Sequence, residues 1–379
     1  MIVRPLTEYC TLNMGQSPDS KTYNTQGKGL PFYQGNADFG ESHPITRVWC
    51  SAPVKVAEDG DILISVRAPI GAMNMAVERC CIGRGLAALT PIRNKCSKKF
   101  LYYALQSKVD SLIAQGTGST FKAIGKKVLE TTCIPAYSTI EQEQIAETIG
   151  HIDNTIAARR NQLALLDQLV KSRFIELFGM PGTDAFGWGL VPLGSTCNIN
   201  PKKSLDSRLV SGAVVSFVPM PAVTEHGEID ATAIKEYDEV KTGFTYFAEN
   251  DVLFAKITPC MENGKGAVAK GLHNGIGFGS TEFHVLRPIS GKTDPYWIYT
   301  LTAFSQFRMD AASNMTGSAG QRRVPASFLE NYRVSLPPIA LQEQFAAFVE
   351  QTDKSKVAVQ KALDEAQLLF DSLMQKYFE

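Results

Sequence analysis

Side chains that suit nucleic-acid contacts recur in turn-rich segments of both halves of this 379-residue chain. Arginine and lysine donate to guanine, asparagine and glutamine pair with adenine, and serine and threonine mostly hold phosphates. In the first half the candidates are Lys21, Tyr23, Gln34, Asn36, Arg67, Asn74, Arg79, Arg84, Ser119 and Lys122. In the second half they are Lys202, Lys203, Lys256, Asn263, Lys265, Ser280, Thr281, Gln321, Arg322 and Arg323. Taken singly, each is more often an ordinary surface residue, so the prediction depends on the recurrence.

Some of these candidate residues lie in two loops of similar sequence, one in each half of the chain. Residues 117–124 and 316–324 both begin Thr-Gly-Ser, and both continue with basic residues. Glycine and serine favour turns over regular structure, and polar loops on a rigid frame often carry binding residues. We expect these two loops to be the principal parts of the contact surface.

Signatures of catalysis are missing from the sequence. It has no phosphate-binding loop, dinucleotide fingerprint, nucleophile elbow or zinc-protease motif, and no Asn-Pro-Pro-aromatic stretch of an adenine methyltransferase. The five histidines are dispersed and the eight cysteines lack metal-ligand spacing. One nuclease alternative is left open, in which Asp230, Glu239 and Lys241 hold Mg²⁺. A solvated surface is the favoured interpretation of that charged stretch.

The net charge of zero conceals an uneven distribution. Residues 1–138 carry 16 basic against 10 acidic side chains, residues 179–337 carry 14 against 15, and both remaining segments are acidic. A neutral chain binds DNA weakly without help, but one domain can still have a basic face. Scattered thiols, the lack of a signal peptide at the N-terminus and the lack of a long apolar run predict a cytoplasmic protein.

Two long helices are predicted to position these loops. Ser138 and Glu141 form a capping box, and each helix that follows has apolar residues at heptad-like spacing. The stripe residues are Ile145, Ile149, Ile152, Ile156, Leu163, Leu166, Val170, Phe345, Val349, Val359, Leu363, Phe370 and Leu373. A helix of roughly 38 residues is about 57 Å long, and a single stripe on it needs a partner. The two helices are therefore expected to form an intramolecular coiled coil; the alternative is that each packs only on its own domain.

A long internal duplication organises the chain. The Gln-Glu-Gln segment at 142–144 returns at 342–344, and Gly-Asp-Ile-Leu at 60–63 corresponds to Asn-Asp-Val-Leu at 250–253. A unit of about 190 residues is too long for a solenoid repeat. It predicts two similar α/β (α+β) domains with approximate twofold symmetry, suited to a bipartite target. The predicted segments are 1–138, 139–180, 181–337 and 338–379, in the order domain, long helix, domain, long helix. Within the first domain we expect a strand at 61–66 and one helix at 98–113.

These features together resemble the specificity subunit of Type I restriction-modification systems. The resemblance covers essentially the whole chain. It is carried by the Asp-Val-Leu-Phe-Ala-Lys-Ile-Thr-Pro-Cys-Met-Glu-Asn-Gly-Lys-Gly run at 251–266, the Gly-Ser-Thr-Glu-Phe-His-Val-Leu-Arg-Pro run at 279–288 and the doubled helix starts.

The resemblance implies a non-catalytic subunit whose two target-recognition domains each read half of a split, asymmetric double-stranded DNA site. It implies that the long helices pair antiparallel and set the gap between the half-sites. Two modification subunits would supply S-adenosylmethionine chemistry, and restriction subunits, where present, would supply ATP- and Mg²⁺-dependent steps. The near-neutral second domain departs from this pattern, so its DNA face must be locally basic or depend on partner subunits. A coiled-coil scaffold with protein-only partners is the other open alternative.

Overall fold

The computed structural model describes residues 2–118, 122–318 and 320–379. The chain divides into two compact units, each described here by itself. Unit 1 comprises residues 1–160 and 361–379, and unit 2 comprises residues 161–360. The boundary falls inside the two long helices, so each unit includes part of both. None of the helices in the described ranges combines the length and the hydropathy that a bilayer crossing needs.

Unit 1 is built on a four-stranded antiparallel sheet in the order β2-β10-β7-β8. A five-stranded sheet in the order β3-β5-β4-β9-β6 contains one parallel pair, β4 with β9, and β1 pairs with β11. The strands are β1 Val3–Pro5, β2 Cys10–Met14, β3 Tyr23–Asn24, β4 Leu30–Tyr33, β5 Trp49–Cys50, β6 Val56–Ala57, β7 Ile62–Ser65, β8 Met73–Met75, β9 Cys80–Ile82, β10 Leu86–Pro91 and β11 Cys133–Pro135. The helices are η1 Leu6–Glu8, η2 Ser20–Thr22, η3 Asn36–Asp38, α1 Lys98–Gln106, α2 Val109–Ala114, α3 Lys126–Thr131 and the first part of α4 Thr139–Phe178.

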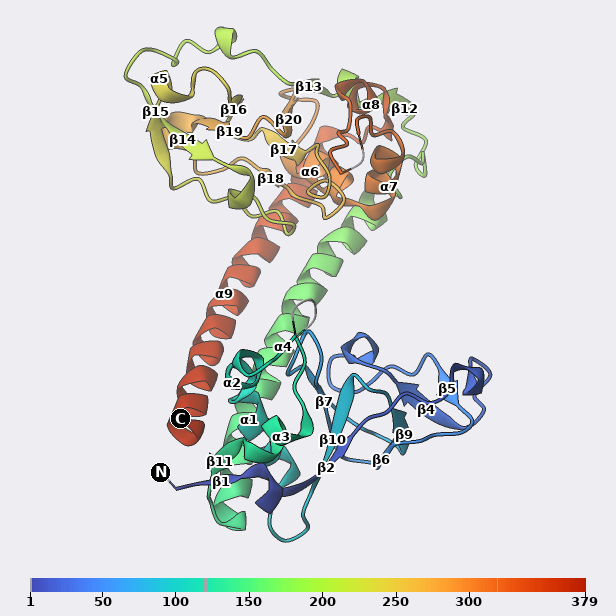
Figure 1. Ribbon diagram of the computed structural model, residues 1–379. Helices are drawn as coiled ribbons and strands as arrows, with labels where there is room; N and C mark the ends of the chain where they lie inside the picture. The colour runs from blue at the N-terminus through green and yellow to red at the C-terminus, as the bar shows by residue number, and fades with distance from the viewer. Residues whose placement is uncertain (1, 119–121, 319) are drawn as a thin grey trace. The chain divides into compact units, whose positions relative to one another are not determined.

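Unit 2 repeats this plan (Figure 1). Its four-stranded antiparallel sheet has the order β13-β20-β17-β18, its second sheet has the order β15-β14-β19-β16 with β14 and β19 parallel, and β12 pairs with β21. The strands are β12 Leu190–Pro192, β13 Cys197–Ile199, β14 Val214–Val218, β15 Ile234–Glu236, β16 Thr245–Ala248, β17 Val252–Ala255, β18 Gly266–Val268, β19 Ile276–Gly279, β20 Phe283–Pro288 and β21 Arg333–Ser335. The helices are η4 Leu193–Ser195, η5 Lys203–Leu205, η6 Met220–Ala222, η7 His273–Gly275, α5 Tyr237–Val240, α6 Pro295–Ala303, α7 Ser305–Ser313 and α8 Ala326–Asn331. Unit 2 also contains the last part of α4 and the first part of α9 Ile339–Phe378, whose last part belongs to unit 1.

The sequence match between residues 60–63 and 250–253 has a cause in the backbone conformation. Gly60 and Asn250 occupy the turn before β7 and β17, and both have positive φ, 83° and 66°. Glycine and asparagine are the residues that tolerate this left-handed conformation at least cost. The aspartate that follows each of them, Asp61 and Asp251, is buried and accepts a backbone N–H three residues upstream, at 2.9 and 2.7 Å.

The predicted strand and capping box are confirmed, but the predicted helix at 98–113 is two helices. Glu141 accepts the backbone N–H of Ser138 at 2.8 Å, and the Ser138 hydroxyl accepts the N–H of Glu141 at 3.4 Å. The hydrogen bonds from Ser138 lower the pKa of Glu141. The chain turns between α1 and α2 at Lys108, whose Nζ donates to the carbonyl of Phe378 at 2.8 Å. This contact, 270 residues away in sequence, is invisible to local periodicity.

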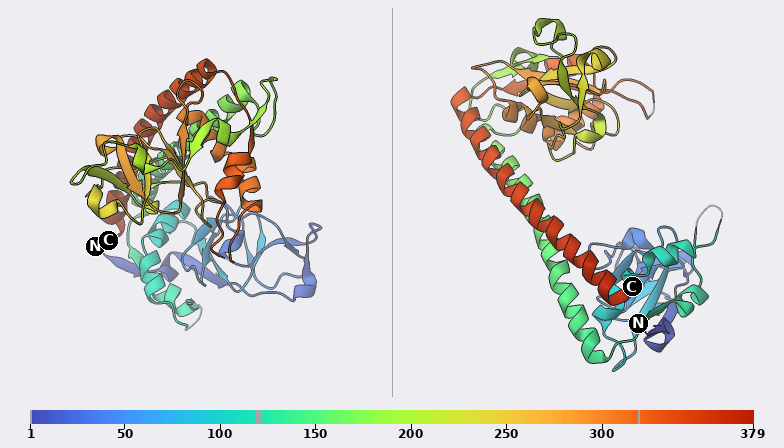
Figure 2. Two further views of the ribbon diagram at one scale, coloured as in Figure 1. Left: turned by 90° about the horizontal axis from the view of Figure 1, so that it is seen from above. Right: turned by 90° about the vertical axis from the view of Figure 1, so that its left-hand side faces the viewer.

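The long helices pair antiparallel, as predicted. In unit 1 the first half of α4 shares a hydrophobic core with the last half of α9, through Ile149 and Phe370 among others. In unit 2 the end of α4 packs on the start of α9, and the ring centroids of Phe174 and Phe345 are 5.5 Å apart. Figure 2 shows α9 in red and α4 in green from two further directions. None of the thirteen stripe residues is exposed, and Leu163 and Leu166 near the middle of α4 are half-buried.

A buried glutamine joins each long helix to the body of its unit. Gln142 accepts the N–H of Ser97 at 2.9 Å and donates to the carbonyls of Lys95 and Tyr137. Gln342 accepts the N–H of Asp294 at 3.0 Å and donates to the carbonyls of Lys292 and Pro337. Both side chains are fully buried, which explains why the Gln-Glu-Gln segment occurs twice.

Candidate nucleic-acid interface

In unit 2 the repeated loop 316–324 is bonded to the loop that follows β17. Arg323 forms backbone bridges with both Ile257 and Thr316. Thr258 N donates to the carbonyl of Arg322 at 3.0 Å, and Val324 N donates to the carbonyl of Lys256 at 2.9 Å. We call this pair of joined loops the unit 2 clamp, residues 256–265 and 316–324 without the undescribed 319.

Unit 1 contains the same clamp, formed by residues 66–68 and 117–124 without the undescribed 119–121. Arg67 and Thr117 both bridge to Ala123, and Ile124 N donates to the carbonyl of Val66 at 2.9 Å. Gly118 and Gly317 follow the threonines with φ of 125° and 118°, a region that favours glycine. The Thr-Gly repeat therefore reflects a shared backbone turn. Ser119, one of the predicted contact residues, lies outside the described residues.

The two arginines of the unit 2 clamp are held by glutamates. Arg322 lies 3.4 Å from Glu262 through a single contact. Arg323 instead pairs with Glu282 through two nitrogens, with Nη2 2.7 Å from Oε1 and Nε 2.9 Å from Oε2. The hydrogen bonds with Arg323 lower the pKa of Glu282, and those with Glu282 raise the pKa of Arg323. The Arg323 side chain is still 42% exposed.

The remaining unit 2 candidates differ in their surroundings. Lys265 lies 3.9 Å from Glu225, and the Ser280 hydroxyl accepts the N–H of Glu282 at 3.2 Å. The exposed candidates are Lys202, Asn263, Thr281 and Gln321, and Lys256 is half-buried. Lys203 donates to the carbonyl of Lys241 beside the second sheet, and no described contact joins it to the clamp. Six of the ten unit 2 candidates therefore lie in the clamp, Ser280 and Thr281 directly precede its partner Glu282, and Lys202 and Lys203 lie elsewhere in the sequence.

In unit 1 the exposed side chains Arg67 and Lys122 lie on the clamp, and no carboxylate in the described ranges pairs with either. A second group lies on the five-stranded sheet. Tyr23 stacks on Phe32 at 4.7 Å, and the carbonyl of Gln34 accepts the N–H of Gly85, next to Arg84. Lys21 is exposed, and Asn36 is the half-buried first residue of η3. Arg79 pairs with Glu58 at 3.2 Å.

Asn74 differs from the other candidates because its amide is used inside the protein. The side chain is 2% exposed in the middle of β8. Its Oδ1 accepts the N–H of Gly40 at 3.0 Å, and its Nδ2 donates to the carbonyls of Gly40 and Met73. These bonds give Asn74 a structural role, fixing the segment around Gly40 to the main sheet.

Two residues that contact the clamp were not among the sequence candidates, Glu282 and His284. Glu282 directly precedes β20 and His284 is its second residue, in the Ser-Thr-Glu-Phe-His stretch. His284 is buried, its Nε2 lies 2.8 Å from the carbonyl of Val324, and burial lowers its pKa. A glutamate two residues after a serine in a loop suggests a solvated acid, so only the tertiary pairing with Arg323 identifies Glu282.

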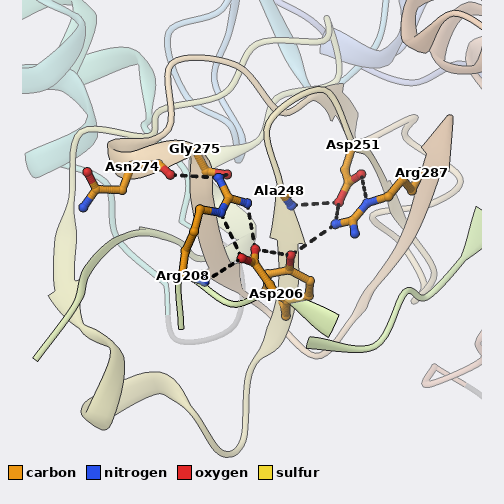
Figure 3. A network of polar contacts seen from close by, with 8 residues as sticks. Asp206, Arg208, Ala248, Asp251, Asn274, Gly275 and Arg287 are labelled. Carbon is orange, nitrogen blue, oxygen red and sulfur yellow. Dashed lines mark hydrogen bonds and ion pairs between the residues drawn. The ribbon is translucent and has the colours of Figure 1, made fainter. Parts of the chain in front are cut away.

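A separate polar network fixes the second sheet of unit 2 to the first (Figure 3). Asp206 accepts from Arg208 at 2.7 Å and from the hydroxyl of Tyr246 at 2.7 Å. Arg287 donates to Asp251 through Nε and Nη2, both at 2.7 Å, and its Nη2 lies 3.5 Å from the Tyr246 hydroxyl. The hydrogen bonds with Arg208 hold the pKa of Asp206 well below its usual range. These charges satisfy one another, so the network supports the sheet.

The residues of the nuclease alternative are engaged with different neighbours. Asp230 accepts from Thr232 at 2.6 Å, Glu239 lies 3.9 Å from Lys235, and Lys241 donates to Asp238 at 3.0 Å. Across the described part of the chain, no three histidine, cysteine, aspartate or glutamate side chains are placed to hold a metal ion. The nuclease alternative is not supported.

The chain is similar to specificity subunits over much of its length. It is 32% identical over 286 residues to the Type I restriction enzyme EcoEI specificity subunit of Escherichia coli, covering 72% of this chain and 47% of that protein. It is 37% identical over 247 residues to the EcoAI specificity subunit of the same organism, covering 62% of this chain and 41% of that protein. The matched part thus spans about half the length of these curated relatives, or less.

A solved structure shares the fold over the whole chain. The S subunit of a Type I restriction-modification system from M. genitalium superposes with a TM-score of 0.59 at 17% identity, covering 100% of this chain and 96% of that one. The family model described as the Type I restriction modification DNA specificity domain matches twice, at residues 1–168 and 187–366. Each match begins at the first strand of a duplicated body and extends into its long helix. The chain belongs to the family of Type I restriction modification DNA specificity domains.

Proposed function

We propose that this chain is the sequence-recognition subunit of a Type I restriction-modification complex, and that each unit reads one half of a bipartite, asymmetric DNA site. The observation that carries the proposal is the repeated clamp. The same backbone bridges hold two loops together in both units, yet the side chains presented differ: Arg67 and Lys122 in unit 1, Arg322 and Arg323 in unit 2. Two clamps with the same backbone and different side chains are suited to reading two half-sites of different sequence.

The clamp residues are of the types that read DNA. Arginine pairs with guanine through two donors, whereas lysine and loop hydroxyls mainly contact phosphates. Residues 1–138 of unit 1 are basic, and its clamp cations have no carboxylate partner among the described residues, which favours phosphate contact. Three cations of the unit 2 clamp, Lys265, Arg322 and Arg323, are paired with glutamates, so we propose that unit 2 adds little non-specific affinity.

The catalytic chemistry is proposed to lie in partner subunits. Two modification subunits would bind this chain and bring S-adenosylmethionine, and restriction subunits, where present, would bring ATP and Mg²⁺. The chain itself would hold no cofactor and catalyse no step, in agreement with the missing sequence motifs. A cytoplasmic location follows from a chromosomal DNA substrate.

Methylation mapping tests this function directly. The genome of a strain with this gene should carry methylated adenines or cytosines in one split motif, and deletion of the gene should remove that motif. Replacing residues 1–138 with the first domain of another family member should change one half of the motif and leave the other half unchanged. Persistence of every methylated motif after deletion would refute the proposal, and would favour the scaffold alternative.

A further inference from the structure

The bidentate pair between Arg323 and Glu282 leaves the arginine with a defined set of open donors. A guanidinium has five N–H groups. Nε and one Nη2 hydrogen are directed at Glu282, and one Nη1 hydrogen is directed at the carbonyl of Gln321, 3.1 Å away. One N–H on each Nη atom then has no partner among the described residues. With the side chain 42% exposed, these two donors can reach a ligand.

The backbone around this pair is fixed by three hydrogen bonds. Lys256 N donates to the carbonyl of Glu282 at 2.9 Å, and Val324 N donates to the carbonyl of Lys256 at 2.9 Å. The buried ring of His284 holds the carbonyl of Val324 at 2.8 Å. Glu282 and Arg323 are therefore both tied to one rigid strand end, and the guanidinium plane is oriented before any ligand arrives.

The two open donors belong to Nη1 and Nη2, the nitrogens whose fork matches the O6 and N7 acceptors of guanine in the major groove. A phosphate can accept the same fork, but only a base edge requires the guanidinium to lie in the plane of one base pair. Arg322 provides the contrast within the same clamp, since a single 3.4 Å contact with Glu262 leaves its orientation loose. In unit 1 the position equivalent to Arg323 is Ala123, so this device is confined to unit 2 within the described residues.

We infer that Arg323 reads a guanine in the half-site of unit 2, and that Glu282 is the positioning residue that orients it. The inference rests on the proposed function and adds the identity of one base and the residue pair that selects it. Arg322 contacts a phosphate.

Four variants test this in the native methylation system, by genome-wide methylation mapping and by salt-dependent binding of the purified complex to a fixed duplex. Arg323→Lys keeps the positive charge but loses the paired guanidinium donors. Discrimination for guanine at one position of one half-site should therefore fall roughly 10- to 100-fold, and the salt dependence of binding should stay the same. Arg323→Ala should lose the same discrimination and also reduce binding. Glu282→Gln should relax that same position and no other.

Arg322→Ala is the matched control, from the neighbouring residue of the same clamp. It should weaken binding at all sites alike and lower the slope of log affinity against log salt by about 1, with the recognised motif unchanged. A Glu282→Gln complex that binds every DNA more tightly, with its motif intact, would mean that the glutamate only masks a cation and would overturn the inference. An unchanged motif in Arg323→Lys, or a unit 2 half-site without any G·C pair, would also overturn it. If the wild-type complex recognises no bipartite motif at all, the proposed function itself fails, which is a different result.

Discussion

Replacing the buried Gln342 with alanine should unfold unit 2 far more readily. The substitution removes three hydrogen bonds, to Asp294, Lys292 and Pro337, and leaves a buried carbonyl, a part-buried carbonyl and a part-buried N–H without these partners. A typical hydrogen bond contributes about 1 kcal/mol net, and each stranded buried group costs about 1–3 kcal/mol. We expect the free energy of unfolding of unit 2 to fall by about 3–5 kcal/mol.

The assay must separate the two units, because a chain with two compact units need not unfold in one step. Urea titration followed by pulsed amide hydrogen exchange achieves this when peptides from β7 and β17 are monitored in the same sample. With a denaturant slope of about 2 kcal/mol/M, the midpoint for β17 should fall by roughly 1.5–2.5 M. The midpoint for β7 in unit 1 should change little.

Gln344→Ala is the matched control, because it removes the same side chain two residues along the helix from an exposed position. Its effect should stay within about 0.5 kcal/mol, as for ordinary surface substitutions. Gln142→Ala should reproduce the large effect in unit 1, with β7 as the reporter. If Gln342→Ala and Gln344→Ala destabilise β17 equally, the glutamine does not anchor the helix, and the explanation of the repeated segment is wrong.

Three further predictions concern pH, length and activity. Hydrogen bonding lowers the pKa of Asp206 in the folded state, so the stability that its carboxylate adds is present above the unfolded pKa of about 3.9 and is lost as pH falls below that value. In Asp206→Asn the melting temperature of unit 2 should therefore fall less steeply with decreasing pH. A plot of melting temperature against pH that is the same as that of the wild type would contradict this. Four residues inserted after Ala158 lengthen α4 by about 6 Å, which is close to one helical turn. The gap between the half-sites of the methylated motif should then lengthen by one or two base pairs, at about 3.4 Å each. An active variant with the original gap would show that the helices do not set the gap length. The purified chain without partners should show no methyltransferase, nuclease or ATPase activity and no nanomolar site-specific DNA binding at physiological salt, and any of these in an anisotropy or turnover assay would refute the division of labour.

The features that follow local rules could be predicted from the sequence. The stripe from Ile145 to Val170 has the period of a helix seam, Ser138 and Glu141 fit a capping box, and the Thr-Gly turns recur because glycine suits their backbone angles. The repeated loops were found for the same reason. In each case the residues that act together lie within a few positions of one another.

The features that depend on distant contacts could not be predicted. Asn74 has the chemistry of an adenine reader, but its bonds reach Gly40, 34 residues away. Glu282 meets Arg323 across 41 residues, and the break between α1 and α2 is accompanied by the bond from Lys108 to Phe378. Hydropathy and spacing carry no information about such pairs, and net charge does not show that cations and carboxylates of unit 2 are paired locally.

The clamp separates the part of the surface that must be conserved for folding from the part that is free to vary. Its bridges are formed by backbone N–H and carbonyl groups, which every residue except proline supplies. In unit 1 an arginine stands at position 67 opposite Ala123, whereas in unit 2 the arginine stands at 323 opposite Ile257. The same frame has thus accepted a cation on either side of the bridge. On the proposed function, single substitutions at these four positions would change the target while leaving the backbone bridges of either body in place.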